Sequence, residues 1–398
     1  MYDPDGKITK RKSIYMGEDP SEGGYAWGKP GIYTNVELYD IASMHPSTII
    51  FLNLFGDEYT ANFKQLVDIR LHIKHKEYDK VREMFDGKLA KYLTSDEDAK
   101  ALSTALKTAI NSVYGLTSAK FSNKLKDPRN IDNIVAKRGA LFMIKLKHEC
   151  LDRGWTVVHC KTDSIKIANA TKEIRDFIFE FGKKYGYTFE HEATYRRMCI
   201  LNHSVYVAKY ADGKHKFDEL PTGEEIMTEW TATGEEFKVP YVFKTLFSHT
   251  PLNFKDYCET FNVQKGSLYL DMNENLTEEE HNYKFIGRVG EFVPIMPGKG
   301  GGELMVLRDD KYSYASGSKG YRWLDSETVK AAGYENNIDK EYFRSLADES
   351  IEHINSFGGE FEWFVSDDND VVNTIVENGP EEVPFEEDFK AMNPPKAV

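Results

Sequence analysis

The chain has 398 residues, of which 40% are hydrophobic, 29% charged and 13% aromatic, and its formal net charge is −14. This length predicts two or three compact units, and the composition excludes a disordered or fibrous protein. No stretch approaches the roughly 18 consecutive apolar residues of a membrane span, and the polar start lacks a secretory signal, so we expect a cytoplasmic protein without a membrane partner. The four cysteines lie far apart with no C-x-x-C pair, which argues against a disulfide framework or a zinc clip.

The charges are distributed unevenly along the chain. Residues 101–200 hold 18 Lys and Arg against 10 Asp and Glu, whereas residues 201–398 hold 19 against 38. A protein that touches a polyanion along one face would show this pattern, and a globular protein with an acidic tail would show it equally well. Charge alone therefore leaves nucleic-acid binding open.

The first elements predicted along the chain are a strand and a pair of helices. Residues 31–44 form a strand that runs into a helix start at Pro46, and the apolar spacing of residues 65–85 predicts a helix. Thr94 and Glu97 make a capping box for the next helix. The apolar face of that helix consists of Leu102, Leu106, Ala109, Ile110 and Val113. We expect the two helices to form a hairpin.

Beyond the helical hairpin, the pattern predicts alternating helices and strands. A helix over about 130–153 leads into WTVVHC and SIKIAN, which are joined only by residues 161–163 and therefore predict a β-hairpin with Asp163 at its tip. A helix near 171–185 and a strand-rich segment, CILNHSVYVAKY, follow. From about residue 220 onward, helices, short strands and Gly-rich turns are mixed.

Two aspartates stand where a sheet would bring metal-binding oxygens together. Asp40 ends the first strand, and Asp163 lies at the tip of the β-hairpin. Carboxylates at strand ends are what a pair of Mg²⁺ ions needs from a protein, since substrate phosphates and water supply the other oxygens. Either residue taken alone would more often be an ordinary turn aspartate.

The helical hairpin carries cations at helical spacing. Lys107, Asn111 and Tyr114 fall at i, i+4 and i+7 on one helix face, while Arg70 and Lys74 fall at i, i+4 on the other helix. Cations at this spacing can bind a triphosphate, and the ring of Tyr114 can pack against a base pair. Charges at this spacing are also common on solvated helix faces, so the pattern alone does not decide.

Taken together, these segments resemble the motifs of the family B DNA polymerases in order and spacing. Asp40-Ile-Ala-Ser-Met-His-Pro-Ser47 is similar to motif A, Lys107-x-x-x-Asn111-Ser112-x-Tyr114-Gly115 to motif B, and Lys161-Thr-Asp163-Ser164 to motif C. Gly23-Gly24-Tyr25 resembles the stretch that precedes motif A. The match covers residues 22 to about 210, and the rest is similar, with fewer motifs, to the thumb and C-terminal regions of phage-encoded members.

The resemblance implies an α+β right-hand polymerase fold with an antiparallel-sheet palm, a two-helix fingers hairpin and a thumb. The implied segments are 1–55, the N-terminal segment and first part of the palm; 56–123, the fingers; 124–215, the second part of the palm; 216–375, the thumb and C-terminal region; and 376–398, a mobile acidic tail.

The resemblance further implies a DNA-directed DNA polymerase that adds deoxynucleotides to a primer 3′-hydroxyl by two-metal phosphoryl transfer. Asp40 and Asp163 would be catalytic and would hold two Mg²⁺ ions with the carbonyl of Ile41, and Mn²⁺ would serve as a substitute. The implied nucleotide-binding residues are Ser43, Met44, His45, Arg70, Lys74, Lys107, Asn111 and Tyr114. The implied DNA-binding residues are Gly23, Gly24, Tyr25, Gly115, Lys161, Thr162, Ser164, Tyr206 and Lys209.

The sequence departs from the family pattern at several places. Lys161 stands where motif C usually has an Asp, and His45 stands where a Tyr usually screens the sugar 2′ position. Only 39 residues precede Asp40, too few for the usual exonuclease domain. We therefore expect the polymerase half of a split phage replicative enzyme, or a truncation product, in the host cytoplasm. Its expected partners are primer–template DNA, deoxynucleoside triphosphates, a separate exonuclease polypeptide and a processivity factor.

Two other classes stay open at this point. Lys161 favours a catalytically impaired palm-fold subunit that serves as a structural or DNA-binding partner in a replication complex. A reverse transcriptase or an RNA polymerase would share the two-metal chemistry, although the N-S-x-Y-G and T-D-S segments resemble DNA-templated DNA synthesis more closely.

Overall fold

The structure, a computed structural model, describes residues 14–20, 24–117, 119, 121–125, 133–273 and 277–367. Gly23 and the predicted acidic tail at 376–398 lie outside these residues. The chain divides into two compact units, with the boundary between Arg196 and Arg197. Among the described residues, no helix is long and apolar enough to cross a membrane.

The largest sheet among the described residues has seven strands in the order β1-β3-β4-β2-β5-β6-β9. The pairs β1–β3, β3–β4, β2–β4 and β6–β9 are antiparallel. The strands are β1 (Ala26–Gly28), β2 (Gly31–Ile41), β3 (Val157–Lys161), β4 (Ser164–Ala168), β5 (Phe189–Ile200), β6 (Tyr206–Tyr210) and β9 (Trp230–Thr233). The boundary between the two units falls within β5.

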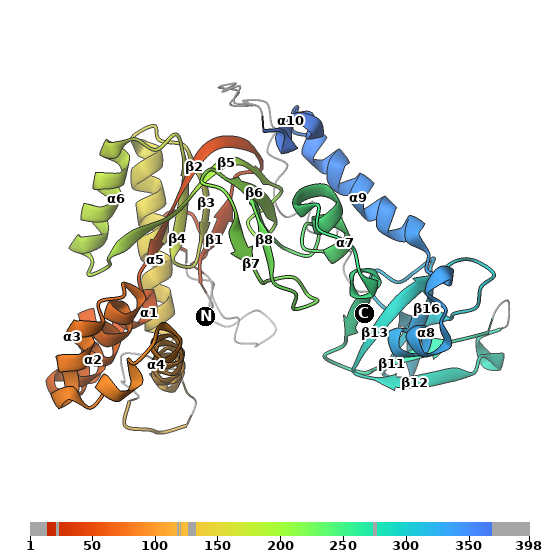
Figure 1. Ribbon diagram of the computed structural model, residues 1–398, viewed down its shortest axis with the longest axis horizontal. Coiled ribbons are helices and arrows are strands. Elements are labelled where there is room, and N and C mark those ends of the chain that lie inside the picture. Colours follow the sequence, from red (N-terminus) through yellow and green to blue (C-terminus); the bar gives the residue numbers. More distant parts are fainter. Residues whose placement is uncertain are drawn as a thin grey trace, which may run out of the picture. The chain divides into compact units, whose positions relative to one another are not determined.

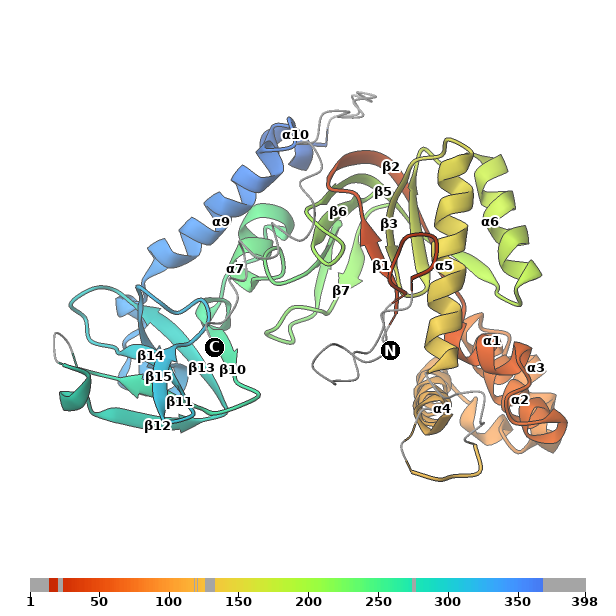
Figure 2. The ribbon, with the colours of Figure 1, turned by 180° about the vertical axis from the view of Figure 1, so that it is seen from behind.

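Two helices of the first unit, α5 (Ile134–Asp152) and α6 (Lys172–Lys184), cover one face of β2, β3 and β4 (Figures 1 and 2). Side chains alternate across a strand, so every second residue of these strands points at the helices. The buried core between the sheet and the helices includes Tyr39, Ile41, Cys160, Ile165, Ile167, Phe142, Met143, Leu146, Ile174 and Ile178. The intervening residues, among them Asp40, therefore point to the opposite face of the sheet.

The predicted helical hairpin is confirmed, with α2 (Asp57–Lys74) packed against α4 (Asp96–Thr117). The prediction of one continuous helix over 65–85 was wrong, because the chain breaks at Lys76, which has a left-handed φ of 58°. The short elements around the pair are α1 (Met44–Phe51), α3 (Tyr78–Glu83), η1 (Met84–Gly87) and η2 (Ala90–Tyr92).

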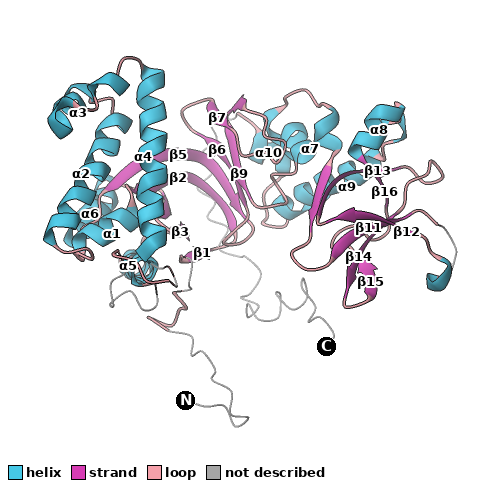
Figure 3. Cartoon of the chain, turned by 90° about the horizontal axis from the view of Figure 1, so that it is seen from below, coloured by secondary structure: helices cyan, strands magenta, loops and turns pink. Residues whose placement is uncertain are grey.

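The described residues of the second unit form, besides the end of the large sheet, three smaller antiparallel sheets and several helices (Figure 3). The sheets are β7 (His215–Phe217) with β8 (Ile226–Thr228); β10 (Glu259–Asn262), β13 (Val289–Ile295) and β16 (Arg322–Asp325); and β12 (Tyr283–Gly287), β11 (Ser267–Asp271), β14 (Glu303–Arg308) and β15 (Lys311–Tyr314). The helices are α7 (Pro240–Phe243), η3 (Lys244–Ser248), η4 (Phe254–Tyr257), η5 (Glu278–Glu280), α8 (Ser326–Ala332), η6 (Glu335–Asn337), α9 (Lys340–Asn355) and α10 (Phe361–Val365). One buried cluster, from β11, β13, β14 and β16, includes Leu268, Leu270, Phe292, Leu304, Val306 and Trp323.

Helices combined with antiparallel strand pairs confirm the predicted α+β class. The right-hand arrangement and the division into palm, fingers and thumb segments stay predictions.

Candidate active site

The strand register brings the two predicted aspartates to the same end of the large sheet. Asp40 of β2 lies opposite Ser164 of β4, which immediately follows Asp163. The backbone N–H of Ile41 donates to the carbonyl of Asp163 at 2.9 Å. Strands β3 and β4 form the predicted hairpin, with Thr162 and Asp163 in its turn. Residues 123 positions apart in the chain are therefore neighbours in the fold.

The electrostatics of this sheet end favour binding of a cation. Burial raises the pKa of Asp40 to about 8, and the charges of Asp163 and Glu192 add to the rise, while Lys74 and Lys166 oppose it. Burial also raises the pKa of Asp163, and Glu192 adds to it. Half-buried carboxylates that repel one another are an arrangement that a divalent cation would relieve.

The donor set fits Mg²⁺ or Mn²⁺ in its chemistry, since the Asp40 and Asp163 carboxylates and the Ile41 carbonyl are all hard oxygen ligands. Within the described ranges, no group of three or more His, Cys, Asp or Glu side chains is placed to hold a metal ion. The two-ion site therefore stays a prediction.

The segment before β1 supports the turn that carries Asp163. The carbonyl of Tyr25 accepts a hydrogen bond from the Thr162 N–H at 2.7 Å. Gly24 has a φ of +137°, and a Cβ there would lie 3.1 Å from Thr162 Oγ1, so a side chain at this position would disturb the turn. The hydroxyl of Tyr25 donates to Glu18, which also accepts from Lys147 at 2.7 Å. The predicted DNA-binding residues Gly24, Tyr25 and Thr162 therefore support the turn that carries Asp163.

Helix α2 carries two of the predicted nucleotide-binding cations, Arg70 and Lys74. Arg70 Nη1 donates to Ser43 Oγ at 3.3 Å, which ties the helix to the residues that follow Asp40. Lys74 forms an ion pair of 2.5 Å with Glu190 of β5. Lys107 lies exposed on α4. A triphosphate that binds Lys74 would therefore have to displace Glu190 from the ion pair.

Helix α4 contributes an aromatic contact to the site. The ring of Tyr114 stacks on His45, with ring centroids 4.4 Å apart and an interplanar angle of 16°. Burial lowers the pKa of His45, so its imidazole is neutral at pH 7, and His45 Nε2 is buried without a hydrogen-bond partner among the described residues. Asn111 and Gly115 lie exposed on the same helix.

Several predicted site residues are buried or make contacts within their own unit, and their predicted roles stay predictions. Met44 is 2% exposed, and a Cβ at Gly139 would lie 2.6 Å from its Cε, so the Met44 side chain belongs to the core. In the second unit, Tyr206 is buried, and Lys209 is 4% exposed and forms ion pairs with Glu229 and Asp367. The Lys209 ammonium is thus already neutralised within its unit. Lys161 and Ser164 lie at the hairpin end, where Ser164 Oγ donates to the Lys161 carbonyl at 3.1 Å.

Two residues near the aspartates were missed by the sequence analysis. Glu192 of β5 acts on both aspartates, and Lys166 of β4 is 3% exposed on the face that carries Asp40. Strand alternation places Lys166 on the same face as Ser164, but it does not tell which strands lie beside it.

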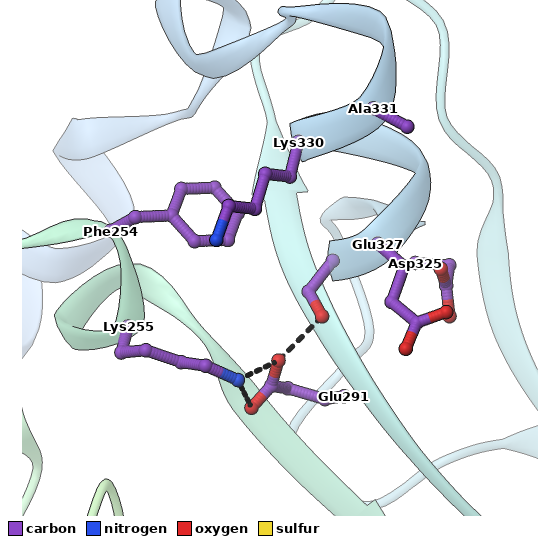
Figure 4. A pocket seen from close by; sticks show the side chains of 8 residues that line it. Phe254, Lys255, Glu291, Asp325, Glu327, Lys330 and Ala331 are labelled. Carbon is purple, nitrogen blue, oxygen red and sulfur yellow. Dashed lines mark hydrogen bonds and ion pairs between the residues drawn. The ribbon is translucent and has the colours of Figure 1, made fainter.

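The described residues also line a pocket of about 640 Å³ in the second unit (Figure 4). Lys255 Nζ lies 2.8 Å and 2.9 Å from the two carboxylate oxygens of Glu291, which also accepts from Ser326. No predicted site residue lines this pocket, and these charged groups already satisfy one another.

Comparison with known proteins gives little beyond the geometry. No family model and no curated protein matches the chain. The structure is similar to that of the family B DNA polymerase from the hyperthermophilic archaeon Pyrobaculum calidifontis, with 12% sequence identity, 88% of this chain covered and a TM-score of 0.41. The chain spans 48% of the length of that protein.

Proposed function

We propose that this chain is the catalytic module of a DNA-directed DNA polymerase that adds deoxynucleotides to the 3′-hydroxyl of a primer. The observation that carries the proposal is the meeting of Asp40 and Asp163 at one sheet end, where burial raises the pKa of both carboxyl groups and the charge of Asp163 adds to the rise at Asp40. The resemblance of the surrounding segments to three polymerase motifs supplies the choice of substrate. Primer–template DNA and deoxynucleoside triphosphates are the partners that it requires.

Asp40, Asp163 and the Ile41 carbonyl would hold two Mg²⁺ ions, or Mn²⁺ in their place. When bound, such ions lower the pKa of an attacking hydroxyl and neutralise the charge on the transferred and leaving phosphates. The protein supplies the position of the carboxylates, which the Ile41–Asp163 hydrogen bond and the Tyr25–Thr162 hydrogen bond hold in register.

The helix pair would bind the nucleotide. Arg70, Lys74 and Lys107 would contact the triphosphate, with Lys74 exchanging Glu190 for phosphate oxygens. The His45–Tyr114 stack would form an apolar wall against the sugar and the base pair. Base selection would then come from pairing with the template and from the shape of the pocket.

Substitution of the two aspartates tests this function. Asp163→Asn and Asp40→Asn should each lower the rate of single-nucleotide primer extension by about a thousandfold, because the carboxylate charge that holds the ions is lost. Affinity for primer–template DNA should stay within about twofold of the wild type, since these residues contribute no cation to the DNA surface. The exposed Asp152 at the end of α5 gives a control, and Asp152→Asn should extend normally. An Asp163→Asn variant that keeps a tenth of the wild-type rate would refute the assignment.

A second candidate is a catalytically impaired subunit that only binds DNA. The observation that favours it is Lys161, a cation at the hairpin end where the resemblance leads one to expect an acid. The same assay separates the two, because the second candidate binds primer–template DNA yet extends no primer in either Mg²⁺ or Mn²⁺.

A further inference from the structure

A carboxylate outside the candidate active site contacts polar groups from two parts of the first unit. Glu18 Oε1 accepts a hydrogen bond from Lys147 Nζ at 2.7 Å and lies 2.6 Å from His148 Nε2, and both of these residues belong to α5. Glu18 Oε2 accepts a hydrogen bond from the hydroxyl of Tyr25. Glu18 therefore joins helix α5 to the segment that precedes β1.

The burial of Lys147 explains why a carboxylate is needed at this place. Lys147 is 3% exposed, and its Nζ lies 4.5 Å from the ring centroid of Trp27 and 5.5 Å from that of Tyr25. Burying an ammonium without a carboxylate partner is costly, and aromatic rings offset only part of that cost. Burial raises the pKa of Glu18, but hydrogen bonds with its three partners outweigh burial and hold this pKa below its ordinary value. Glu18 is therefore charged at neutral pH and is held in place by α5.

Tyr25 connects Glu18 to the turn of the candidate active site. The hydroxyl of Tyr25 donates to Glu18, and the carbonyl of Tyr25 accepts from the Thr162 N–H at 2.7 Å. The residues that follow Tyr25 pair with β3 as far as Lys161. Because Asp163 is the next residue after Thr162, a displacement of Tyr25 would also displace the Asp163 carboxylate.

We propose that Glu18 is a positioning residue, which fixes the turn that carries Asp163 by holding Tyr25 against helix α5. Glu18 acts through Tyr25 and contacts no reacting atom. The inference rests on the proposed function in one respect only, that Asp163 is catalytic.

Hydrogen–deuterium exchange of the full chain, without DNA, nucleotide or metal, tests the inference. Glu18→Gln removes the charge with little change in volume, and Tyr25→Phe removes only the hydroxyl. Each substitution should raise the exchange rate of backbone amides in the β3–β4 turn by about tenfold, because the Thr162 N–H then donates to a carbonyl that is no longer fixed. At this turn, the double variant should exchange no faster than the faster single variant, since both substitutions break the same connection.

Two substitutions in the same unit serve as matched controls. Glu149→Gln breaks an ion pair of 2.7 Å with Arg153 on α5. Tyr33→Phe removes a hydroxyl that donates to the Lys29 carbonyl at 3.0 Å. Neither substitution should change amide exchange at the β3–β4 turn.

Primer extension gives a second readout that a merely structural residue would not move in the same way. In Glu18→Gln and in Tyr25→Phe, kcat should fall by about tenfold while KM for the deoxynucleotide stays within about twofold, because the Asp163 carboxylate is displaced and the helix pair is unchanged. Tyr25→Phe leaves Glu18 and Lys147 paired, so it carries both readouts if Glu18→Gln does not fold.

Two results would overturn the inference. One is amide exchange at the turn within about twofold of the wild type in the folded variants, and the other is an equal rise of exchange throughout the first unit, which would make Glu18 a general stabiliser of the fold. A chain that extends primers but shows no local rise of exchange would retain the proposed function and lose this inference. A chain that shows the local rise but extends no primer would lose the proposed function and keep the positioning of the turn.

Discussion

His45 and Tyr114 join the residues that follow Asp40 to the helix that carries Lys107. Their stacked rings, 4.4 Å apart, present a neutral wall, because burial lowers the pKa of His45 and disfavours its charged form. We expect an aromatic wall of this kind to pack against the apolar face of a deoxyribose and to exclude a 2′-hydroxyl.

Replacement of His45 tests whether this wall selects the sugar. His45→Gly opens space beside Tyr114, so the efficiency of ribonucleotide relative to deoxynucleotide incorporation should rise by about tenfold or more. Steady-state kcat/KM for matched ribo- and deoxynucleoside triphosphates measures the ratio. His191→Gly, a change at an exposed ring on β5, serves as the control. If the ratio of ribonucleotide to deoxynucleotide efficiency is unchanged in His45→Gly, another residue selects the sugar.

Glu259 of β10 gives the second unit a predictable dependence on pH. Burial raises the pKa of Glu259 to about 7, with the charge of Glu235 adding to the rise and a hydrogen bond from Tyr342 opposing it. The native state therefore keeps a proton that the unfolded chain releases near its ordinary pKa of 4.5. The stabilising contribution is fully present below pH 4.5 and is lost as the pH rises through about 7.

Glu259→Gln should remove this dependence, because a neutral amide replaces a carboxyl that would otherwise ionise in a buried site. The melting temperature of the variant relative to the wild type should therefore increase between pH 5 and pH 8, as measured by thermal unfolding in EDTA. The exposed Glu335 provides the control, and Glu335→Gln should show no such trend. A difference that stays constant over this range would contradict the assignment.

The helix pair shows which features of an element can be deduced from its own sequence. The pairing of α2 with α4 followed from the apolar spacing, whereas the break at Lys76 did not, because apolar residues continue at helical spacing on both sides of it. The predicted cap at Thr94 was wrong by one residue. Ser95 Oγ accepts from the Asp98 N–H at 3.1 Å, and Thr94 instead donates to the Asp98 carboxylate.

Capping of α4 can be tested by a matched pair of substitutions. Ser95→Ala leaves a backbone N–H of the first turn without its acceptor and should lower the free energy of unfolding by about 1 kcal/mol. Thr94→Ala removes a contact between two exposed side chains and should cost less than half as much. Chemical denaturation of the two variants measures the loss of unfolding free energy in each. Equal losses would mean that Ser95 is not the cap of α4.

The hairpin of β3 and β4 was predicted with Asp163 at its tip, since two apolar runs joined by a few residues leave few alternatives, although Lys161 belongs to β3 and not to the turn. The residues near that tip were not predicted. Glu192 and Lys166 lie close to the aspartates because of how the strands pair, and strand pairing cannot be read from a single sequence. For a similar reason the sequence did not predict that Lys209 is buried and ion-paired, and its role as a DNA contact stays a prediction. Its partner Asp367 lies 158 residues away in the chain.

The whole chain divides into two compact units, and its charge is divided as well. Residues 101–200 carry an excess of eight positive charges and residues 201–398 an excess of nineteen negative ones. A polyanion should therefore be held by the cations of the first unit, in spite of the net charge of −14.

This distribution predicts a strong effect of salt on DNA binding. Each phosphate contacted by a cation releases counterions, so affinity for primer–template DNA should fall by about a thousandfold or more between roughly 50 and 200 mM salt. Fluorescence anisotropy of labelled duplex measures the slope. A fall of less than about tenfold would mean that the cations of residues 101–200 are structural.

The proposed synthesis of DNA at the Asp40–Asp163 pair depends on a template, and this dependence can be measured directly. The most direct measurement supplies the purified chain with a primer annealed to a template of one defined next base, Mg²⁺, and each of the four deoxynucleotides separately. We expect addition of only the complementary deoxynucleotide, dependent on Mg²⁺ or Mn²⁺, and a change of preference when the template base is changed. Addition that ignores the template base, or no addition in either metal by protein that binds the duplex, would contradict it.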